Sequence, residues 1–343
     1  MHTHLRPLTL GEILDRTAQL YRTHFLLLAG IASVYASVLL AFSLFQIAAQ
    51  EILRANHMTS LLVWVTLGSA VFMIPVILIA GGIAVAANNR AVSWIHLGEP
   101  ATIRTAYRSI LPRLGRYLWL MVMTAFIVWI PFGVLYGGFM VFVILYARPR
   151  GIFVRGTVQQ DPQAFVLFGV VALAVGLLSL AAIVYAVLMG LRYSLAVPAC
   201  VIEDLKARKA LRRSAELSKG SRGRIFLLTL LVVAIQVGLA LISQIFFVVA
   251  TFRHHGALPA GIRVLQQLVA FFTNSFVGPI YATGFTLFYY DQRVRKEGFD
   301  IEWMMKAAGM SPAGEASGSP GSLPSGDPAA LASSPTSSED QPA

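Results

Sequence analysis

Residues 197–224 read VPACVIEDLKARKALRRSAELSKGSRGR, and this stretch decides how the rest of the chain is interpreted. It holds eight Lys and Arg side chains within the nineteen positions from Lys206 to Arg224, and an uncharged run of more than twenty residues lies on each side, 162–191 before it and 225–252 after it. A strongly basic connection between two long apolar runs is typical of a cytoplasmic loop in a polytopic membrane protein. The segment therefore predicts helices that cross the membrane before and after it.

The composition of the whole chain agrees with this interpretation. Hydrophobic residues make up 57% of the 343 and charged residues 13%, whereas about a quarter of a soluble domain is charged. The mean hydropathy is +0.70. The formal net charge of +11 is spread over short connections between apolar runs, so we expect anionic lipid headgroups, and not nucleic acid, to interact with it. With Cys200 as the single cysteine, an intramolecular disulfide is excluded.

Six uncharged apolar runs each exceed the roughly 20 residues that a helix needs to cross about 30 Å of hydrocarbon. They cover about residues 25–48, 61–87, 117–146, 164–190, 225–250 and 264–290. The sequence therefore predicts an all-α membrane bundle of six transmembrane helices over residues 25–290. Pro131 and the pair Gly137-Gly138 are candidates to break the third run, whose limits are the least defined.

A short amphipathic helix is predicted before the first span. Thr9 and Glu12 have the spacing of a capping box, and Ile13, Thr17 and Leu20 recur at helical intervals. We expect residues 1–24 to form a cytoplasmic N-terminus with an amphipathic helix over 9–24 that lies at the membrane surface.

The combination of a basic amphipathic segment and two spans occurs three times. Leu10-Gly11-Glu12 recurs as Leu97-Gly98-Glu99, after which Pro100 suits a first helical position. The third copy begins at Glu203-Asp204. These segments suggest three repeats of one surface helix and a two-span hairpin. The alternative is that cytoplasmic connections of any membrane protein look basic and amphipathic.

The chain changes character after the last span. Residues 291–308 form a charged stalk and then a cytoplasmic amphipathic segment with Phe299 and Trp303 four positions apart. Just after a span, these aromatic side chains would lie at the level of the lipid headgroups, where Trp and other aromatic residues are common. Residues 309–343 consist almost wholly of Ser, Pro, Gly and Ala. Such a composition buries too little apolar area to offset chain entropy, so we expect a disordered tail.

The distribution of Lys and Arg predicts the orientation. Of the 27 Lys and Arg residues, 21 lie on the side of the two termini, and positive connections stay in the cytoplasm. We therefore expect a multi-pass protein of the cytoplasmic membrane with both termini inside the cell. Arg148, Arg150 and Arg155 are the exception, since they fall on the outer side.

The sequence contains none of the HExxH, GxSxG, P-loop or GxGxxG motifs. We expect no catalytic residue, cofactor or metal site. The predicted spans hold amides but no ionisable carboxylate or base, which argues against a proton-coupled pump. Gln236, Gln244 and Asn274 lie well inside the spans and each needs a partner in lipid. We expect them to bond between helices, and the alternative is that they line a polar cavity.

Several segments resemble a bacterial family of six-span integral membrane proteins, which is similar to the membrane domain of some glycerophosphoryl diester phosphodiesterases. The segments are Leu8–Arg16, Val201–Asp204, Ala210–Ser214, Leu217–Gly220, Tyr289–Asp291 and Arg293–Asp300, so the resemblance covers about residues 8–306. In those enzymes catalysis belongs to a separate metal-dependent TIM barrel of roughly 250 residues. The longest polar segment here is the 53 residues after 290. The resemblance therefore implies a membrane module without the catalytic domain.

Two functions remain open. The first is a non-enzymatic membrane protein that binds anionic lipids or partner proteins through its basic surface helices, at about 1 kcal/mol per Lys or Arg near the surface. Its candidate residues are Lys206, Arg208, Lys209, Arg212, Arg213 and Lys219, which could instead serve only as orientation signals. The second is a transporter or channel for a neutral or amphiphilic solute, with the path lined by Gln236, Gln244 and Asn274. The sequence identifies no protein partner.

Overall fold

A computed structural model describes residues 6–147, 162–253 and 258–307. Every regular element in these ranges is a helix, which confirms the all-α prediction. The chain divides into two compact units, Met1–Gly298 and Phe299–Ala343. The described part of the second unit is one helix, α12 (Phe299–Ala307). The predicted disordered tail over 309–343 and the outer arginines of 148–155 lie outside the described residues.

Six helical stretches of the first unit are long and apolar enough to cross a membrane. They are Phe25–Ala55, Ser60–His96, Ile103–Tyr146, Val166–Ile202, Arg222–Arg253 and Ala260–Glu297. Each overlaps one predicted run, so the number and order of the spans are confirmed. The chain is accordingly a membrane-embedded helical protein.

The helices of the first unit follow a repeating order. They are α1 (Leu10–Thr23), α2 (Phe25–Ala55), α3 (Thr59–Val76), the π-helical turn η1 (Ile77–Gly81), α4 (Gly82–His96), α5 (Ile103–Ile110), η2 (Leu111–Arg113), α6 (Leu114–Phe142), η3 (Val143–Ala147), α7 (Pro162–Tyr193), α8 (Ala196–Ile202), α9 (Ala207–Ser218), α10 (Arg222–Arg253) and α11 (Ala260–Glu297). A short helix, namely α1, α5 or α9, precedes each pair of spans. This order matches the predicted unit of a surface helix and a two-span hairpin.

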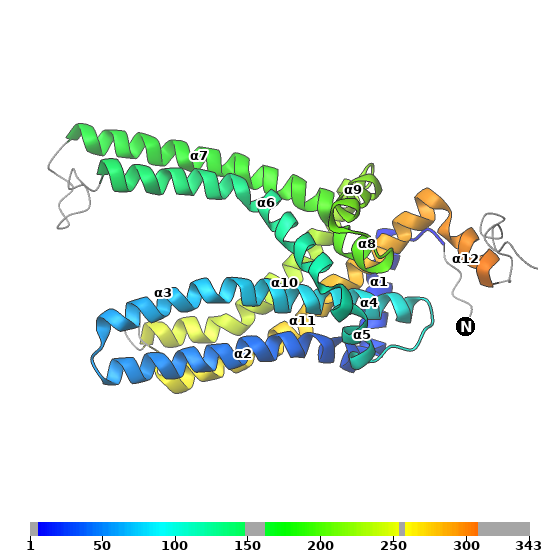
Figure 1. Ribbon diagram of the computed structural model, residues 1–343, viewed down its shortest axis with the longest axis horizontal. Helices are drawn as coiled ribbons and strands as arrows, with labels where there is room; N and C mark the ends of the chain where they lie inside the picture. The colour runs from blue at the N-terminus through cyan, green and yellow to red at the C-terminus, as the bar shows by residue number, and fades with distance from the viewer. Residues whose placement is uncertain (1–5, 148–161, 254–257, 308–343) are drawn as a thin grey trace, which may run out of the picture. The chain divides into compact units, whose positions relative to one another are not determined.

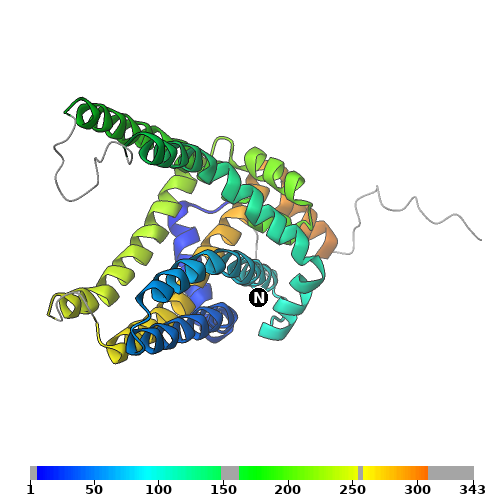
Figure 2. The same cartoon turned by 60° about the vertical axis from the view of Figure 1, so that its left-hand side comes forward.

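The short helices α1, α5, α8 and α9 gather at one end of the first unit, and the long helices extend away from them (Figure 1). We call this the short-helix end. Helix α2 packs along α11, with α3 beside α2 and α10 beside α11. Helices α6 and α7 pair with each other and meet the other helices mainly through α4, α8 and α9 (Figures 1 and 2). The short-helix end is thus where the three hairpins are joined.

Side-chain burial differs between the short-helix end and the rest of the spans. The largest fully buried side chains lie mostly at or near the short-helix end and include Ile13, Leu28, Ile110, Tyr117, Leu195, Leu217, Ile225, Phe288 and Tyr289. Farther along the spans, large apolar side chains are exposed on the surface, among them Trp64, Phe72, Phe126, Trp129, Leu180, Ile242 and Phe246. Exposed apolar faces of this size are expected where lipid, and not water, is the solvent.

Helix α1 begins as the capping box predicted. The Glu12 backbone N–H donates to Thr9 Oγ1 over 3.3 Å, and the Thr9 N–H donates to Glu12 Oε2 over 2.7 Å. This donation by the Thr9 N–H lowers the pKa of Glu12. Ile13 and Leu20 are buried, and the Tyr21 hydroxyl donates to the Phe276 carbonyl on α11. The amphipathic helix is therefore confirmed, and its apolar face packs against protein.

Two predicted helix boundaries are wrong. Pro100 begins no helix, because α5 begins at Ile103 with Thr102 as its N-cap and Thr105 completing the capping box. Helix α6 runs through Pro131 and ends only at the π-helical turn η3. A proline removes one backbone donor, and the neighbouring hydrogen bonds keep the helix intact in an apolar span.

The structure also moves the end of the last span. Residues 291–297 are the final turns of α11 and not a separate stalk. The helix ends at Gly298, which has φ 64° and donates its N–H to the Val294 carbonyl. A left-handed residue at this position is the usual helix stop. This extension places the charged residues of the stalk inside the folded unit, where they form the site described next.

Candidate functional site

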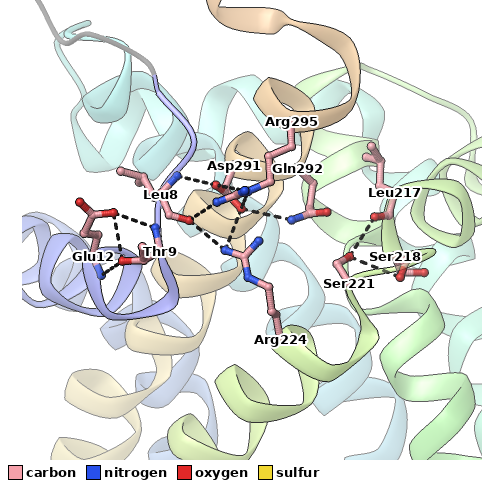
Figure 3. A network of polar contacts seen from close by, with 10 residues as sticks. All are labelled: Leu8, Thr9, Glu12, Leu217, Ser218, Ser221, Arg224, Asp291, Gln292 and Arg295. Atoms are coloured by element: carbon pink, nitrogen blue, oxygen red, sulfur yellow. Dashed lines mark hydrogen bonds and ion pairs between the residues drawn. The ribbon is translucent and has the colours of Figure 1, made fainter.

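The carboxylate of Asp291 joins three segments that lie far apart in the sequence. Its side chain is 0% exposed. The Leu8 backbone N–H donates to Oδ1 over 2.8 Å, and Arg295 Nε lies 3.0 Å from both carboxylate oxygens. Arg224 Nη2 lies 3.1 Å from Oδ2. Figure 3 shows these side chains converging from the N-terminal segment, α10 and α11.

The Leu8 carbonyl completes this arrangement. It accepts hydrogen bonds from Arg224 Nη2 over 2.9 Å and from Arg295 Nη2 over 2.5 Å, as Figure 3 shows. Leu8 directly precedes the capping residue Thr9, so the capping box also fixes where the Leu8 peptide points. A buried carboxylate is tolerated only when it is paired and hydrogen-bonded. The two arginines and the Leu8 N–H meet that requirement for Asp291.

The carboxylate of Glu203 is a second centre, located where α8 ends. Arg213 Nε lies 3.0 Å from both carboxylate oxygens, and the Tyr289 hydroxyl also donates to Glu203. Arg293 Nε approaches to 3.7 Å. Arg213 Nη2 donates in addition to Glu297 Oε2 over 2.7 Å. These contacts tie α9 to the last turns of α11.

Arg213 was one of the six candidate lipid-binding residues, and the structure gives it a different partner. Burial by itself disfavours its charge, but hydrogen bonds to Glu203 and Glu297 outweigh that effect and raise the pKa of Arg213. The guanidinium is thus held in a network of carboxylates within the protein. No pattern in the sequence indicates this pairing, because Glu297 lies 84 positions away and its approach is set by packing, and a role of Arg213 in lipid binding stays a prediction.

The neighbouring Asp204 holds the α6–α7 hairpin in place. It has φ 57°, a left-handed backbone that Asp tolerates better than most residues. Arg116 Nη1 donates to the Asp204 carbonyl over 3.0 Å and to Oδ1 over 3.2 Å, and Arg113 forms an ion pair with the same carboxylate. The connection between α8 and α9 is therefore fixed to both α6 and α11.

The outward face of α9 carries the other five candidate residues, which we call the α9 basic face. They are Lys206, Arg208, Lys209, Arg212 and Lys219, and all are exposed. Among the described residues none of the five forms an ion pair. The opposite face of α9 is buried as predicted, and Ser214 Oγ donates to the Arg192 carbonyl at the end of α7 over 2.9 Å. The helix therefore docks through its apolar side and leaves its cations outward.

The three predicted intramembrane amides do not come together. Gln244 accepts a hydrogen bond from Gln266 Nε2 over 2.9 Å, which confirms the expected bond between α10 and α11. Gln236 forms no hydrogen bond with the described residues. Asn274 lines a cavity of about 300 Å³ between α2, α4, α6 and α11, and neither glutamine does. Tyr35 and Asn88 share that cavity with Asn274. Asn88 is another amide near the end of an apolar run, whereas no pattern in the sequence distinguishes Tyr35.

The described residues contain no group of three His, Cys, Asp or Glu side chains that could hold a metal ion. Cys200 is buried on α8, and its thiol donates to the Leu205 carbonyl over 3.2 Å. Comparison of the chain with protein-family models, with curated proteins and with solved structures gives no match.

Proposed function

We propose that the chain is a non-enzymatic, multi-pass module of the cytoplasmic membrane whose short-helix end binds anionic lipid headgroups. The α9 basic face is the observation that carries this proposal. Five exposed cations lie on α9 and its two cap residues, while the neighbouring Arg213, Arg224 and Arg295 are paired with carboxylates. Each exposed cation contributes about 1 kcal/mol to attraction by an anionic leaflet.

The proposal includes an orientation in which the short-helix end faces the cytoplasm. The hydrogen bond between the Leu8 N–H and Asp291 supports it, since this bond brings the start of α1 to the end of α11. Six crossings place both ends on one side. The 21 Lys and Arg residues on that side favour the cytoplasm.

We further propose that the chain is related to the six-span family that it resembles. The segments that carry the resemblance contain residues from both carboxylate networks of the short-helix end. Leu8, Glu203 and Asp291 each belong to one of these segments, and they lie within the two networks of the short-helix end. Residues that hold the hairpins together would be needed in any protein with this membrane module, so their presence in these segments fits the proposed relationship.

A transporter lined by Gln236, Gln244 and Asn274 has weaker support. Gln244 accepts a hydrogen bond from Gln266, and of the three amides Asn274 alone lines the cavity described above. A continuous path would require the three amides to line one space. Lipid binding at the short-helix end requires no such path.

Replacing Arg208, Lys209 and Arg212 by Gln tests the proposal. The purified chain in neutral detergent would be titrated with a fluorescent phosphatidylglycerol, and the same titration with phosphatidylcholine measures binding that is independent of charge. At about 1 kcal/mol per cation, reduced by screening, we expect the triple variant to bind phosphatidylglycerol at least about tenfold more weakly.

The control replaces Arg54 and Arg253, two exposed arginines at the opposite end of the spans, by Gln. We expect this control to keep the phosphatidylglycerol affinity of the unaltered chain. Equal affinity in the triple variant and the control would assign the α9 basic face to membrane orientation alone.

A further inference from the structure

The cavity between α2, α4, α6 and α11 is a second place where the molecule can hold a ligand. Its volume of about 300 Å³ is at the lower end of the range for small-molecule sites, about 300–1,000 Å³. Its walls come from four helices that belong to four different spans, and no charged side chain is among the residues that line it. An ion would therefore find no counter-charge there, and a neutral, mainly apolar molecule would suit the walls.

Three polar side chains border this apolar space, each from a different helix. They are Tyr35 on α2, Asn88 on α4 and Asn274 on α11. Asn88 is 3% exposed, and its Nδ2 donates to the Ala84 carbonyl of its own helix over 3.2 Å. Its Oδ1 is buried without a hydrogen-bond partner in the described structure. Turning the amide around would set Oδ1 against the Ala84 carbonyl, so the unpaired atom is the acceptor.

Tyr35 and Asn274 supply hydrogen-bond donors to the same cavity wall. Neither the Tyr35 hydroxyl nor the Asn274 amide forms a hydrogen bond with any described residue. Unpaired polar groups are unfavourable inside a membrane, because no bulk water replaces the missing partner. A few polar groups in an otherwise apolar pocket are typical of a site that orients its ligand by hydrogen bonds.

The backbone of the second span is also irregular where it borders the cavity. The π-helical turn η1 contributes Ile77, Leu78 and Gly81 to the wall. A Cβ at Gly81 would lie 3.4 Å from the Tyr35 ring, and one at Gly82 would lie 3.3 Å from Met121 Cγ. The two glycines thus let the wall approach α2 and α6 closely. Single π-helical turns within longer helices are frequent at functional sites.

We propose that this cavity binds one neutral amphiphile that carries a hydroxyl group on a long apolar chain. The hydroxyl donates to Asn88 Oδ1 and accepts from Tyr35 or Asn274, and the chain contacts the apolar wall that includes Ile77 and Met121. This site is separate from the α9 basic face and takes a ligand without charge. It therefore goes beyond the binding of anionic headgroups proposed above.

The test uses a photoactivatable derivative of 1-dodecanol and the corresponding derivative of dodecanoic acid, each with the purified full chain in lipid nanodiscs. We expect the alcohol to label peptides of η1–α4 or α11, and the ionised acid to label them at least about tenfold less, since the cavity offers it no counter-charge. Excess unlabelled 1-dodecanol should abolish the specific signal. Equal labelling by the two probes would overturn the proposal, and so would labelling that excess alcohol leaves unchanged.

Gly278→Leu fills the cavity. A Cβ at Gly278 has no heavy atom within 4 Å, so the new side chain extends into the open space without a clash. We expect at least about a tenfold loss of alcohol labelling. Gly238→Leu on α10 is the matched control, because its Cβ position is equally open and it does not line the cavity. Equal loss or equal retention in the two variants would contradict the assignment.

Asn88→Leu keeps the size of the side chain and removes the acceptor, so it tests the hydrogen bond without filling the cavity. We expect the affinity for 1-dodecanol to fall about tenfold, the loss of one buried hydrogen bond. Unchanged affinity would refute the role of Asn88. The Arg208, Lys209 and Arg212 triple variant should be labelled by the alcohol as the unaltered chain is, which keeps the two binding proposals independent.

Discussion

Replacing Asp291 by Asn is expected to lower the free energy of unfolding by about 3 kcal/mol, the largest effect that we expect from a single substitution in this chain. The amide keeps the volume of the carboxylate but removes the fully buried anion with which Arg224 and Arg295 pair. It also weakens the bond that holds the Leu8 peptide. Unfolding in mixed micelles with increasing denaturing detergent, followed by circular dichroism, would measure the change.

Glu51→Gln is the control for this prediction. Glu51 pairs with Arg54 and Arg263 at the opposite end of the spans, and its side chain is 43% exposed. Exposed ion pairs contribute about 0–1 kcal/mol, so we expect a much smaller loss of stability. Limited proteolysis adds a local measurement, since release of Leu8 should make the segment before α1 easier to cleave in the Asp291 variant. Equal stability losses in the two variants would show that Asp291 is not a centre of the fold.

Replacing Glu203 by Gln is expected to lower the free energy of unfolding by about 2 kcal/mol. The substitution leaves Arg213 with Glu297 as its remaining carboxylate and weakens the acceptor of the Tyr289 hydroxyl. The same unfolding measurement applies. The expected effect is smaller than that of Asp291 because the Glu203 side chain is 17% exposed and water can solvate it in part.

A double-mutant cycle separates this network from a general loss of stability. Arg213→Gln should destabilise the unaltered chain more than it destabilises the Glu203→Gln variant, since the two residues share one ion pair. Arg213 and Asp291 have no ion-pair partner in common among the described residues, so the effects of Arg213→Gln and Asp291→Asn should add. Additive effects for Arg213 and Glu203 would mean that their ion pair contributes no stability.

The number and order of the spans could be predicted because they follow from where charged and apolar residues lie in the sequence. Each of the six apolar runs is free of charge and the charges are concentrated between the runs, so the number of spans could be predicted from the sequence. The capping box of Thr9 and Glu12 and the buried face of α9 could also be predicted, since both depend on residues within one or two helical turns.

The candidate sites could be predicted only in part, because they depend on contacts across the chain. Asp291 stands beside four charged residues and looks exposed in the sequence, yet the packing of Leu8 and Arg224 buries it. In the sequence Arg213 cannot be distinguished from its basic neighbours on α9, and only the packing of the helices brings Glu297 beside it. Tyr35 and Asn88 belong to different spans, and no spacing rule relates them. Local patterns predict helices, whereas these sites depend on how the helices pack.

The central claim is that six spans place the short-helix end in the cytoplasm, and cysteine accessibility tests it most directly. Cys200 is buried and is the single cysteine, so Cys200→Ala provides a background for one reporter at a time. Arg208→Cys would report on α9, and Gly261→Cys on the start of α11 at the opposite end. Both variants would be exposed in spheroplasts to a maleimide that cannot cross the membrane. We predict labelling at 261 in intact spheroplasts and labelling at 208 only after permeabilisation. Labelling at 208 from outside, or protection of 261 until the membrane is opened, would contradict the account.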